Sequence, residues 1–432
     1  MTGLLQADAV ALPLADDTVD LVVTSPPYFA LRSYQDDGEH YDGQIGSEAT
    51  PAEFIDALWA VTAECVRVLK PSGSLWVNLG DKYAGSGGHN NAGLAKPHTG
   101  SITFAGQAKN KQSRPPIRRD APASYNKASG YARRKSLMGL PWRYAIGCID
   151  DLGLILRAEV IWAKPNGLPE SVKDRVRRSH EQWFHFTLEP MYFTALDEIR
   201  EPYKSSAPYA FRGHSTEVDG DKRNDFGRNC VGEKYPLGRV PGSVWSIPNE
   251  PLRVPDHVAV KHFAAFPQEW PRRLILGWSP AEVCSTCQQG RRPVVERDPD
   301  YVAFREATGD WNASNRKPGG YEQKVNRTTD APTAPPWSGR ITGYACDCPD
   351  TTAPSTPGVV LDPFCGTGTV PMVAHALGRT GIGVDLSGDY LRLASWRVFE
   401  SGHAQKSIDR TNANVRVKSS EETSTNPDPG DM

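Results

Sequence analysis

Residues 359–370, VVLDPFCGTGTV, have the pattern of a buried strand that runs into a glycine-rich turn and then into a helix. Gly366 and Gly368 let a ligand approach the backbone of this turn closely, because neither has a Cβ atom. The next strand ends in Asp385, which follows Gly368 by 17 residues. An acid in that position can accept hydrogen bonds from both hydroxyls of a ribose. The segment therefore predicts a nucleoside-cofactor site at the edge of a parallel sheet.

Strand and helix patterns alternate in other parts of the chain. Residues 18–24 form a β-branched run that suits a strand buried on both faces. A helix is predicted from Pro51 to about Leu69, capped by Thr50, and a strand is predicted over 74–79. A second helix and strand are predicted between about Pro141 and Trp162. This alternation predicts an α/β fold with a mostly parallel sheet and helices on both faces.

The composition of the 432 residues limits the classes of protein that remain. Apolar residues make up 38% of the chain, which is enough for a sizeable core and excludes wholesale disorder. The formal net charge is −2, so any nucleic-acid binding must depend on local basic patches. No apolar run approaches the length of about 18 residues that a membrane helix needs. The first 20 residues lack the pattern of a secretory signal, and we expect a cytoplasmic protein.

The glycine-rich turn favours S-adenosylmethionine over a dinucleotide as the cofactor. A pyrophosphate-binding turn would read G-x-G-x-x-G, but Pro371 occupies the third glycine position. Asp362, next to the turn, would repel a pyrophosphate and attract the cationic sulfonium and ammonium groups of S-adenosylmethionine.

Ser25-Pro26-Pro27-Tyr28 directly follows the predicted strand 18–24. Ligands of open α/β sheets bind at the carboxyl ends of the strands. The Ser25 hydroxyl and the Pro26 carbonyl can accept hydrogen bonds from an exocyclic amino group, and proline fixes the direction of that carbonyl. Tyr28 offers a flat face on which a base can stack. These four residues are the predicted catalytic residues.

Together the two motifs resemble those of the S-adenosylmethionine-dependent DNA amino-methyltransferases, in the β class whose catalytic motif precedes the cofactor motif. Ser25–Tyr28 matches the catalytic tetrapeptide, and 362–369 matches the cofactor loop. The resemblance implies a Rossmann-like methyltransferase core, which is a three-layer α/β sandwich, extended here by loop-rich insertions. The similar segments cover about 1–80, 136–200, 255–280 and 355–400.

The resemblance also implies roles for further residues. The region from Ile161 to Glu181 is similar to the segment that borders the target-base pocket, which implies substrate binding by Lys164, Asn166, Glu170 and Ser171. Phe263 with Phe266-Pro267 looks like the stretch that packs on the methionine end of the cofactor, and Asp8 resembles the acid near the adenine. The implied cofactor-binding residues are Asp8, Phe266, Pro267, Asp362, Pro363, Phe364, Gly366, Thr367, Gly368, Thr369 and Asp385.

The family resemblance implies a substrate and partners. Serine at the head of the tetrapeptide favours N4 of cytosine in double-stranded DNA, with N6 of adenine as the alternative. The base must leave the duplex to reach such a site. A cognate restriction enzyme is a candidate partner. The open alternatives are an NAD-dependent oxidoreductase, a catalytically silent DNA-binding protein, and the same chemistry on RNA or on a protein glutamine.

Two tight cysteine pairs predict a structural zinc site with the ligands Cys284, Cys287, Cys346 and Cys348. The spacing C-x-x-C suits tetrahedral zinc, whereas the second pair, C-x-C, is one residue shorter. Unliganded reduced thiols and a redox pair are the alternatives. The zinc would hold together a small module that cannot build its own core.

Residues between the core segments are rich in glycine, proline and polar side chains. Nine lysines and arginines lie between 109 and 135, which suits either a solvated or disordered loop or an arm that orders on nucleic acid. In the second case we expect Arg118, Arg119, Arg133 and Arg134 to follow DNA phosphates. The predicted organisation is three core parts (1–80, 136–196, 256–280), a basic insertion (81–135), a target-recognition region (197–255), a zinc module (281–354), a cofactor-binding part (355–400) and a disordered tail (401–432).

Overall fold

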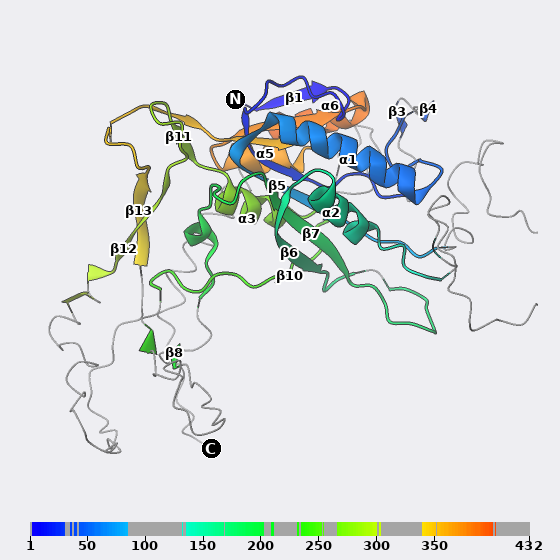
Figure 1. The fold of residues 1–432 in the computed structure, drawn as a ribbon, viewed down its shortest axis with the longest axis horizontal. Coiled ribbons are helices and arrows are strands. Elements are labelled where there is room, and N and C mark those ends of the chain that lie inside the picture. Colours follow the sequence, from blue (N-terminus) through cyan, green and yellow to red (C-terminus); the bar gives the residue numbers. More distant parts are fainter. Residues whose placement is uncertain are drawn as a thin grey trace, which may run out of the picture. The chain divides into compact units, whose positions relative to one another are not determined.

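The computed structural model divides the chain into two compact units (Figure 1). The first contains Met1–Phe193, Ser243–Ala281 and Pro357–Met432, and the second contains Thr194–Gly242 and Glu282–Thr356. Arg118, Arg119, Arg133, Arg134, Phe263 and the tail beyond Gly402 lie outside the residues that the structure describes. The described residues are 2–30, 35–36, 39–40, 43–84, 132, 135–167, 169–202, 209–210, 231–232, 235–252, 254, 266–299, 302–303, 339–350, 352–400 and 402.

A mixed eight-stranded sheet forms the centre of the first unit. Strand β7 is antiparallel to its neighbours β5 and β6, and the other pairs of neighbouring strands are parallel. The predicted mostly parallel α/β sheet is therefore confirmed. In spatial order the strands are β1 (Gly3–Gln6), β16 (Thr380–Asp385), β15 (Val359–Asp362), β2 (Val19–Thr24), β5 (Leu69–Leu79), β7 (His180–Thr187), β6 (Ile155–Ala163) and β10 (Val244–Ser246).

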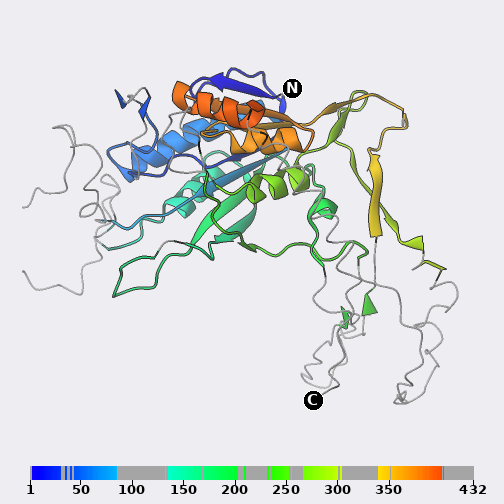
Figure 2. The same ribbon diagram turned by 180° about the vertical axis from the view of Figure 1, so that it is seen from behind.

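Helices cover both faces of this sheet, which gives three layers. Helices α1 (Pro51–Val68) and α2 (Leu140–Asp150) lie in front of the sheet in Figure 1. On the opposite face, seen from behind in Figure 2, lie α3 (Glu269–Trp278), α5 (Thr369–Ala376) and α6 (Gly388–Ser395). A π-helical turn, η4 (Trp396–Glu400), follows α6 directly. Within the described part of the chain, none of the helices combines the length and the apolar character needed to cross a membrane.

Both ends of α1 agree with the sequence prediction, but the start of the strand that follows it does not. The Glu53 amide donates to Thr50 Oγ1 over 3.2 Å, and the Thr50 amide donates to Glu53 Oε2 over 2.9 Å, which completes a capping box. The helix ends at Val68, and β5 begins at Leu69 instead of at residue 74. A register shift in the pairing of β5 with β2 lets the strand contain 70–73.

The second unit contains small sheets. Strand β12 pairs antiparallel with β13 and has a register shift, and β11 pairs with β14. The bounds are β11 (Glu282–Cys284), β12 (Arg292–Arg297), β13 (Gly339–Ala345), β14 (Ser355–Pro357), η1 (Leu196–Ile199), β8 (Tyr209–Ala210) and β9 (Val231–Gly232). One further small hairpin, β3 (Gln35–Asp36) with β4 (Glu39–His40), belongs to the first unit.

Candidate active site and cysteine cluster

The two sequence motifs follow neighbouring parallel strands. Strand β2 pairs with β15 in the register Leu21 with Val360 and Val22 with Leu361. Their carboxyl ends therefore lie at the same edge of the sheet. Thr24 Oγ1, at the end of β2, donates to Asp362 Oδ1, at the end of β15, over 2.8 Å. One hydrogen bond thus joins the strands that carry Ser25–Tyr28 and the glycine-rich turn.

Asp362 is directed into the protein. Its carboxylate accepts hydrogen bonds from the Thr24 hydroxyl and from the Phe364 amide, the latter over 3.1 Å, both at Oδ1. The residue is 1% exposed, and burial raises the pKa of its carboxyl to about 7. Asp362 therefore connects the catalytic strand to the cofactor turn, and its attraction for a cationic cofactor stays a prediction.

The glycine-rich turn fits a nucleoside cofactor. Gly366 has φ +47°, and a Cβ added to it would meet no atom within 4 Å, so one side of its backbone is open. The Gly366 amide donates to Asp385 Oδ2 over 2.9 Å, and Asp385 ends β16. Gly368, with φ +72°, serves packing instead, because an added Cβ would lie 2.9 Å from Ala394 Cβ. Pro363 is buried at the start of the turn, and Phe364 is half-buried.

A buried arginine supports this turn from inside the protein. Arg397 Nη1 donates to Thr367 Oγ1 over 2.8 Å and to Thr369 Oγ1 over 2.6 Å. Burial lowers the pKa of the guanidinium to about 10, so it is still a cation at neutral pH. Sequence reasoning missed Arg397, because an arginine 28 residues beyond the turn has no motif signal.

The other predicted cofactor residues lie on neighbouring elements. Phe266 packs its ring edge-on against Trp183 of β7, with 5.9 Å between the centroids, and Pro267 accepts the Trp270 amide near the start of α3. Asp8 is exposed just beyond β1, the strand that pairs with β16. Its carboxylate accepts the Val10 amide over 3.1 Å.

A polar network surrounds the catalytic turn. The Ser25 and Tyr28 hydroxyls both donate to Asn78 Oδ1, over 3.2 and 2.7 Å. Tyr28 Oη also lies 2.8 Å from Glu181 Oε2, and Lys164 Nζ forms a 2.5 Å ion pair with Glu181 Oε1. Pro26 is buried, and Pro27 is half-buried. The network therefore joins residues that follow β2 and β6 with Asn78 of β5 and Glu181 of β7 around one side of Tyr28.

Asn78 was missed by the sequence analysis, and Glu181 was recognised only as part of a family segment. A signal for Asn78 was available, because it is an amide within the otherwise apolar run Leu75–Leu79 at the end of a buried strand. Such a group needs partners when it is buried.

The other three predicted base-binding residues have different surroundings. Asn166 exchanges two hydrogen bonds with the backbone of Asn249, over 3.1 and 2.7 Å. Glu170 forms a 2.8 Å ion pair with Arg175, and Ser171 is exposed. Their contact with a base therefore stays a prediction.

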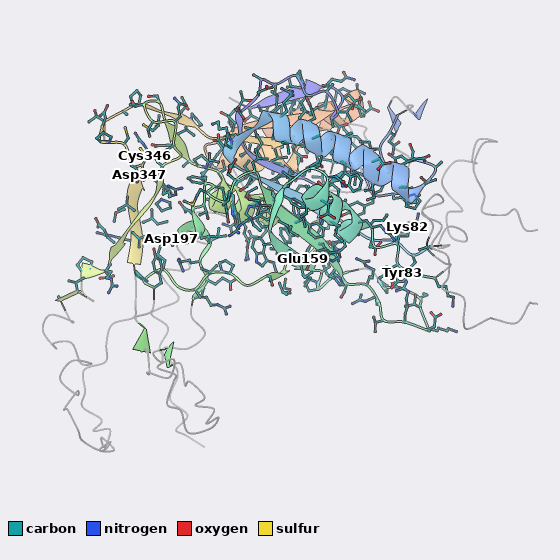
Figure 3. All side chains as sticks on the ribbon, viewed as in Figure 1. Lys82, Tyr83, Glu159, Asp197, Cys346 and Asp347 are labelled. Carbon is teal, nitrogen blue, oxygen red and sulfur yellow. The ribbon has the colours of Figure 1, made fainter. Side chains whose placement is uncertain are left out.

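The basic insertion is attached beside the catalytic turn. Within the insertion, the Lys135 amide donates to the Ala84 carbonyl over 2.8 Å. Lys82 and Tyr83 follow the carboxyl end of β5 (Figure 3), and Lys82 Nζ donates to the Ala30 carbonyl over 2.6 Å. Ala84 and Lys135 are therefore neighbours, close to the residues that follow Tyr28.

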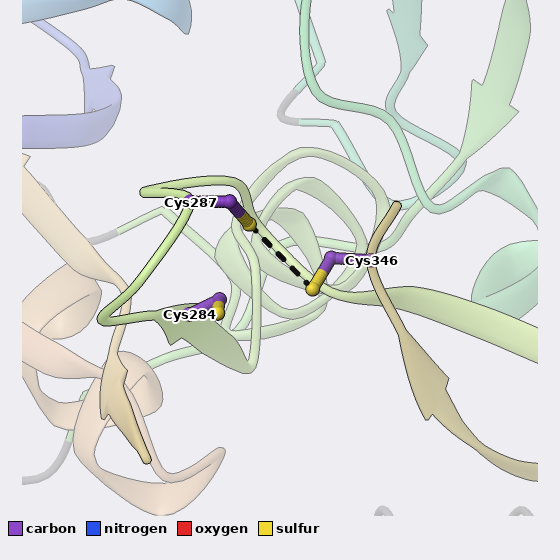
Figure 4. A group of neighbouring side chains, drawn as sticks. All are labelled: Cys284, Cys287 and Cys346. Atoms are coloured by element: carbon purple, nitrogen blue, oxygen red, sulfur yellow. Dashed lines mark hydrogen bonds between the residues drawn. The ribbon is translucent and has the colours of Figure 1, made fainter. Parts of the chain in front are cut away.

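Three of the four predicted zinc ligands come together in the second unit. The Sγ atoms of Cys284, Cys287 and Cys346 all lie within 4.8 Å of one another, and those of Cys287 and Cys346 are 3.7 Å apart (Figure 4). Hydrogen bonds from the Cys287 and Thr286 amides lower the pKa of the Cys284 thiol to about 6. Among the described residues, this group of sulfur atoms does not include Cys348. The three thiols form a donor set that fits zinc.

Comparison with known proteins identifies relatives of the chain. The sequence model of a family described as DNA methylase, N6_N4_Mtase, matches residues 19–282 and 352–395. The type II methyltransferase M.XycI of Xanthomonas campestris pv. cyanopsidis is 29% identical over 91% of this chain and 87% of that protein. M.Cfr9I of Citrobacter freundii is 31% identical over 69% of this chain and 84% of that protein. A solved structure of the PvuII DNA methyltransferase (cytosine-N4-specific) aligns with 96% of this chain and 93% of that chain at 14% identity, and its TM-score of 0.48 supports no inference.

Proposed function

This chain belongs to the family of S-adenosylmethionine-dependent DNA amino-methyltransferases, and we propose that it methylates N4 of cytosine in double-stranded DNA. The observation that carries the proposal is the hydrogen bond between Thr24 and Asp362, which joins the strands before the two motifs. Family membership also decides against the NAD-dependent oxidoreductase.

The residues of this chain bind and orient the reactants. When bound, S-adenosylmethionine supplies an electrophilic methyl group on a sulfonium. The open backbone at Gly366 and the carboxylate of Asp385 would hold its nucleoside part. Ser25 Oγ and the Pro26 carbonyl would accept hydrogen bonds from the two N–H groups of the target amine, which directs the nitrogen lone pair toward the methyl group. After methyl transfer the nitrogen would release one proton to solvent. The Tyr28 ring would stack on the flipped base.

The assignment to cytosine is based on Ser25, because family members with serine at the head of the tetrapeptide are mostly N4-cytosine enzymes. The test is mass spectrometry of nucleosides from unmethylated genomic DNA treated with the purified protein and S-adenosylmethionine. We expect N4-methylcytosine, and a much smaller amount with the Ser25→Ala variant. N6-methyladenine as the only product would contradict the base assignment, and DNA binding without any methyl transfer would support the silent binding protein.

We infer that target recognition uses the segments 81–135 and 197–255, with the basic insertion contacting phosphates. The attachment of that insertion at Ala84 and Lys135 supports this role. The curated relatives are called type II methyltransferases, which supports a cognate restriction enzyme as partner and a location in the cytoplasm with the DNA.

We also propose structural zinc at Cys284, Cys287 and Cys346. Cys348, two residues beyond Cys346, would be the fourth ligand. Metal analysis of purified protein should give about one zinc per chain, and the double variant Cys284→Ser, Cys287→Ser should lose it. Cys148→Ser is the matched control, because Cys148 is a buried cysteine in α2. Unchanged zinc content in the double variant would refute the site.

A further inference from the structure

We propose that Asn78 is a positioning residue that makes the Ser25 hydroxyl a pure hydrogen-bond acceptor for the target amino group. The inference rests on the proposed function, because it concerns how Ser25 meets an exocyclic amine. Asn78 lies near the end of β5, and its partner Ser25 directly follows the neighbouring strand β2. Asn78 would act through Ser25, without touching the base.

A serine hydroxyl alone is poorly suited to this task. The target amino group has two N–H donors, and its lone pair must stay free for the methyl group. A hydroxyl can either donate or accept, and its proton rotates to suit its surroundings. If the Ser25 proton pointed toward the base, it would compete for the lone pair that performs the substitution. The proton therefore needs a fixed acceptor on the opposite side.

Asn78 provides that acceptor in the structure. Ser25 Oγ donates to Asn78 Oδ1 over 3.2 Å, and Tyr28 Oη donates to the same atom over 2.7 Å. Asn78 is 1% exposed, so water does not replace it as the acceptor. With its proton held there, Ser25 Oγ has its lone pairs left for the amino group.

The orientation of the Asn78 amide is also determined. Its Nδ2 donates to the backbone carbonyl of Gln182 over 3.0 Å. If the amide were flipped, Oδ1 would face that carbonyl, and two acceptors would be in contact. Because Gln182 belongs to β7, the sheet itself keeps Oδ1 directed toward Ser25 and Tyr28.

A double-mutant cycle tests whether Asn78 acts through Ser25. We would measure kcat and KM with radiolabelled S-adenosylmethionine and unmethylated genomic DNA for the wild type, Ser25→Ala, Asn78→Ala and the double variant. Asn78→Ala should lower kcat by about 10- to 100-fold and leave the KM for S-adenosylmethionine nearly unchanged. In the Ser25→Ala background, the additional Asn78→Ala substitution should lower kcat by less than about threefold. If the two single-variant losses in kcat multiplied in the double variant, the inference would be overturned. The same holds if Asn78→Ala changed only KM.

Thr62→Ala is the matched control for the loss of a buried hydrogen bond. Thr62 is 4% exposed in α1 and bonds the Tyr144 hydroxyl over 2.7 Å. This control should lower the melting temperature without changing kcat. A wild type without any methyl transfer would instead refute the proposed function, so the two failures are distinguishable.

The Asn78→Asp variant keeps the test decisive if Asn78→Ala does not fold. Its carboxyl retains an acceptor for Ser25 but, when ionised, lacks a donor for the Gln182 carbonyl. Protonation restores that donor, so the kcat of Asn78→Asp relative to wild type should rise as the pH falls toward about 6. Glu181 and Lys164 face the same network and are present in both proteins, so the ratio to wild type reports the effect of the substitution at position 78. A ratio independent of pH, or falling with falling pH, would contradict the assigned role.

Discussion

At the scale of single residues, the site depends on polar atoms that pair across strands. Ser25, Tyr28 and Asp385 could be found from the sequence, because each lies at or just beyond the end of a strand run in a recognisable pattern. The partners of those residues could not be found in this way. Asn78 and Arg397 reach the two motifs only through pairings between distant parts of the chain.

Replacing Asp362 by asparagine should change how stability depends on pH. Folding raises the pKa of this carboxyl from 3.8 to about 7, mainly through burial, so the native state holds its proton more tightly than the unfolded chain. The contribution of Asp362 to the free energy of unfolding should therefore fall as pH rises from about 4 to about 7. Asparagine can keep both hydrogen bonds, since both reach Oδ1.

Urea unfolding at a series of pH values would check this expectation. Asp362→Asn should remove part of the decline in stability between about pH 4 and pH 7. An unchanged slope would show that the carboxyl does not titrate in this range. Calorimetry with S-adenosylmethionine at about pH 8 tests the predicted attraction, because loss of the negative charge should then weaken binding.

At the scale of elements, periodicity and capping predicted β2, α1, α2, β6 and the turn into α5, because these signals are local. The position of β7 between β5 and β6 was not predictable, since strand pairing is non-local. This order places Glu181 and the Gln182 carbonyl beside the catalytic turn. Local patterns therefore predicted the strands and the turn, whereas the walls of the site depend on the order of the strands.

Gly80, which directly follows β5, provides a test of this arrangement. A Cβ at Gly80 would lie 2.7 Å from Tyr28 Cε2 and 3.1 Å from Cδ2, so Gly80→Ala should displace the ring. We expect a loss of stability of about 1–3 kcal/mol and a fall in kcat of about tenfold or more. Gly3→Ala is the control, because a Cβ at Gly3 would meet no atom within 4 Å. Full activity of Gly80→Ala would show that the position of the Tyr28 ring does not matter for methyl transfer.

At the scale of the whole molecule, the chain combines a methyltransferase core with a second unit of small sheets. The sequence predicted the core from its motifs and the cysteine cluster from its spacing, and the structure brings together three of the four cysteines. It could not show that 194–242 and 282–356 form one compact unit, since no motif links these segments. The roles assigned to them in target recognition and zinc binding stay predictions.

Two compact units with different ligands should respond separately to those ligands. S-Adenosylmethionine at about 100 times its Kd should stabilise the core by about 2.7 kcal/mol, because it binds only the folded state. Removal of zinc with 1,10-phenanthroline should destabilise the second unit, because its sheets are small and its cysteines would lose the metal ion that they share. Differential scanning calorimetry of the full chain should therefore show one transition whose temperature rises with S-adenosylmethionine and another whose temperature falls with chelation.

The Cys284→Ser, Cys287→Ser variant is the control for chelation. Its second transition should already lie at the lowered temperature without chelator, and the chelator should not change it further. A single transition that moves with both ligands would mean that the units unfold together, and insensitivity to the chelator would remove zinc from the account of the second unit.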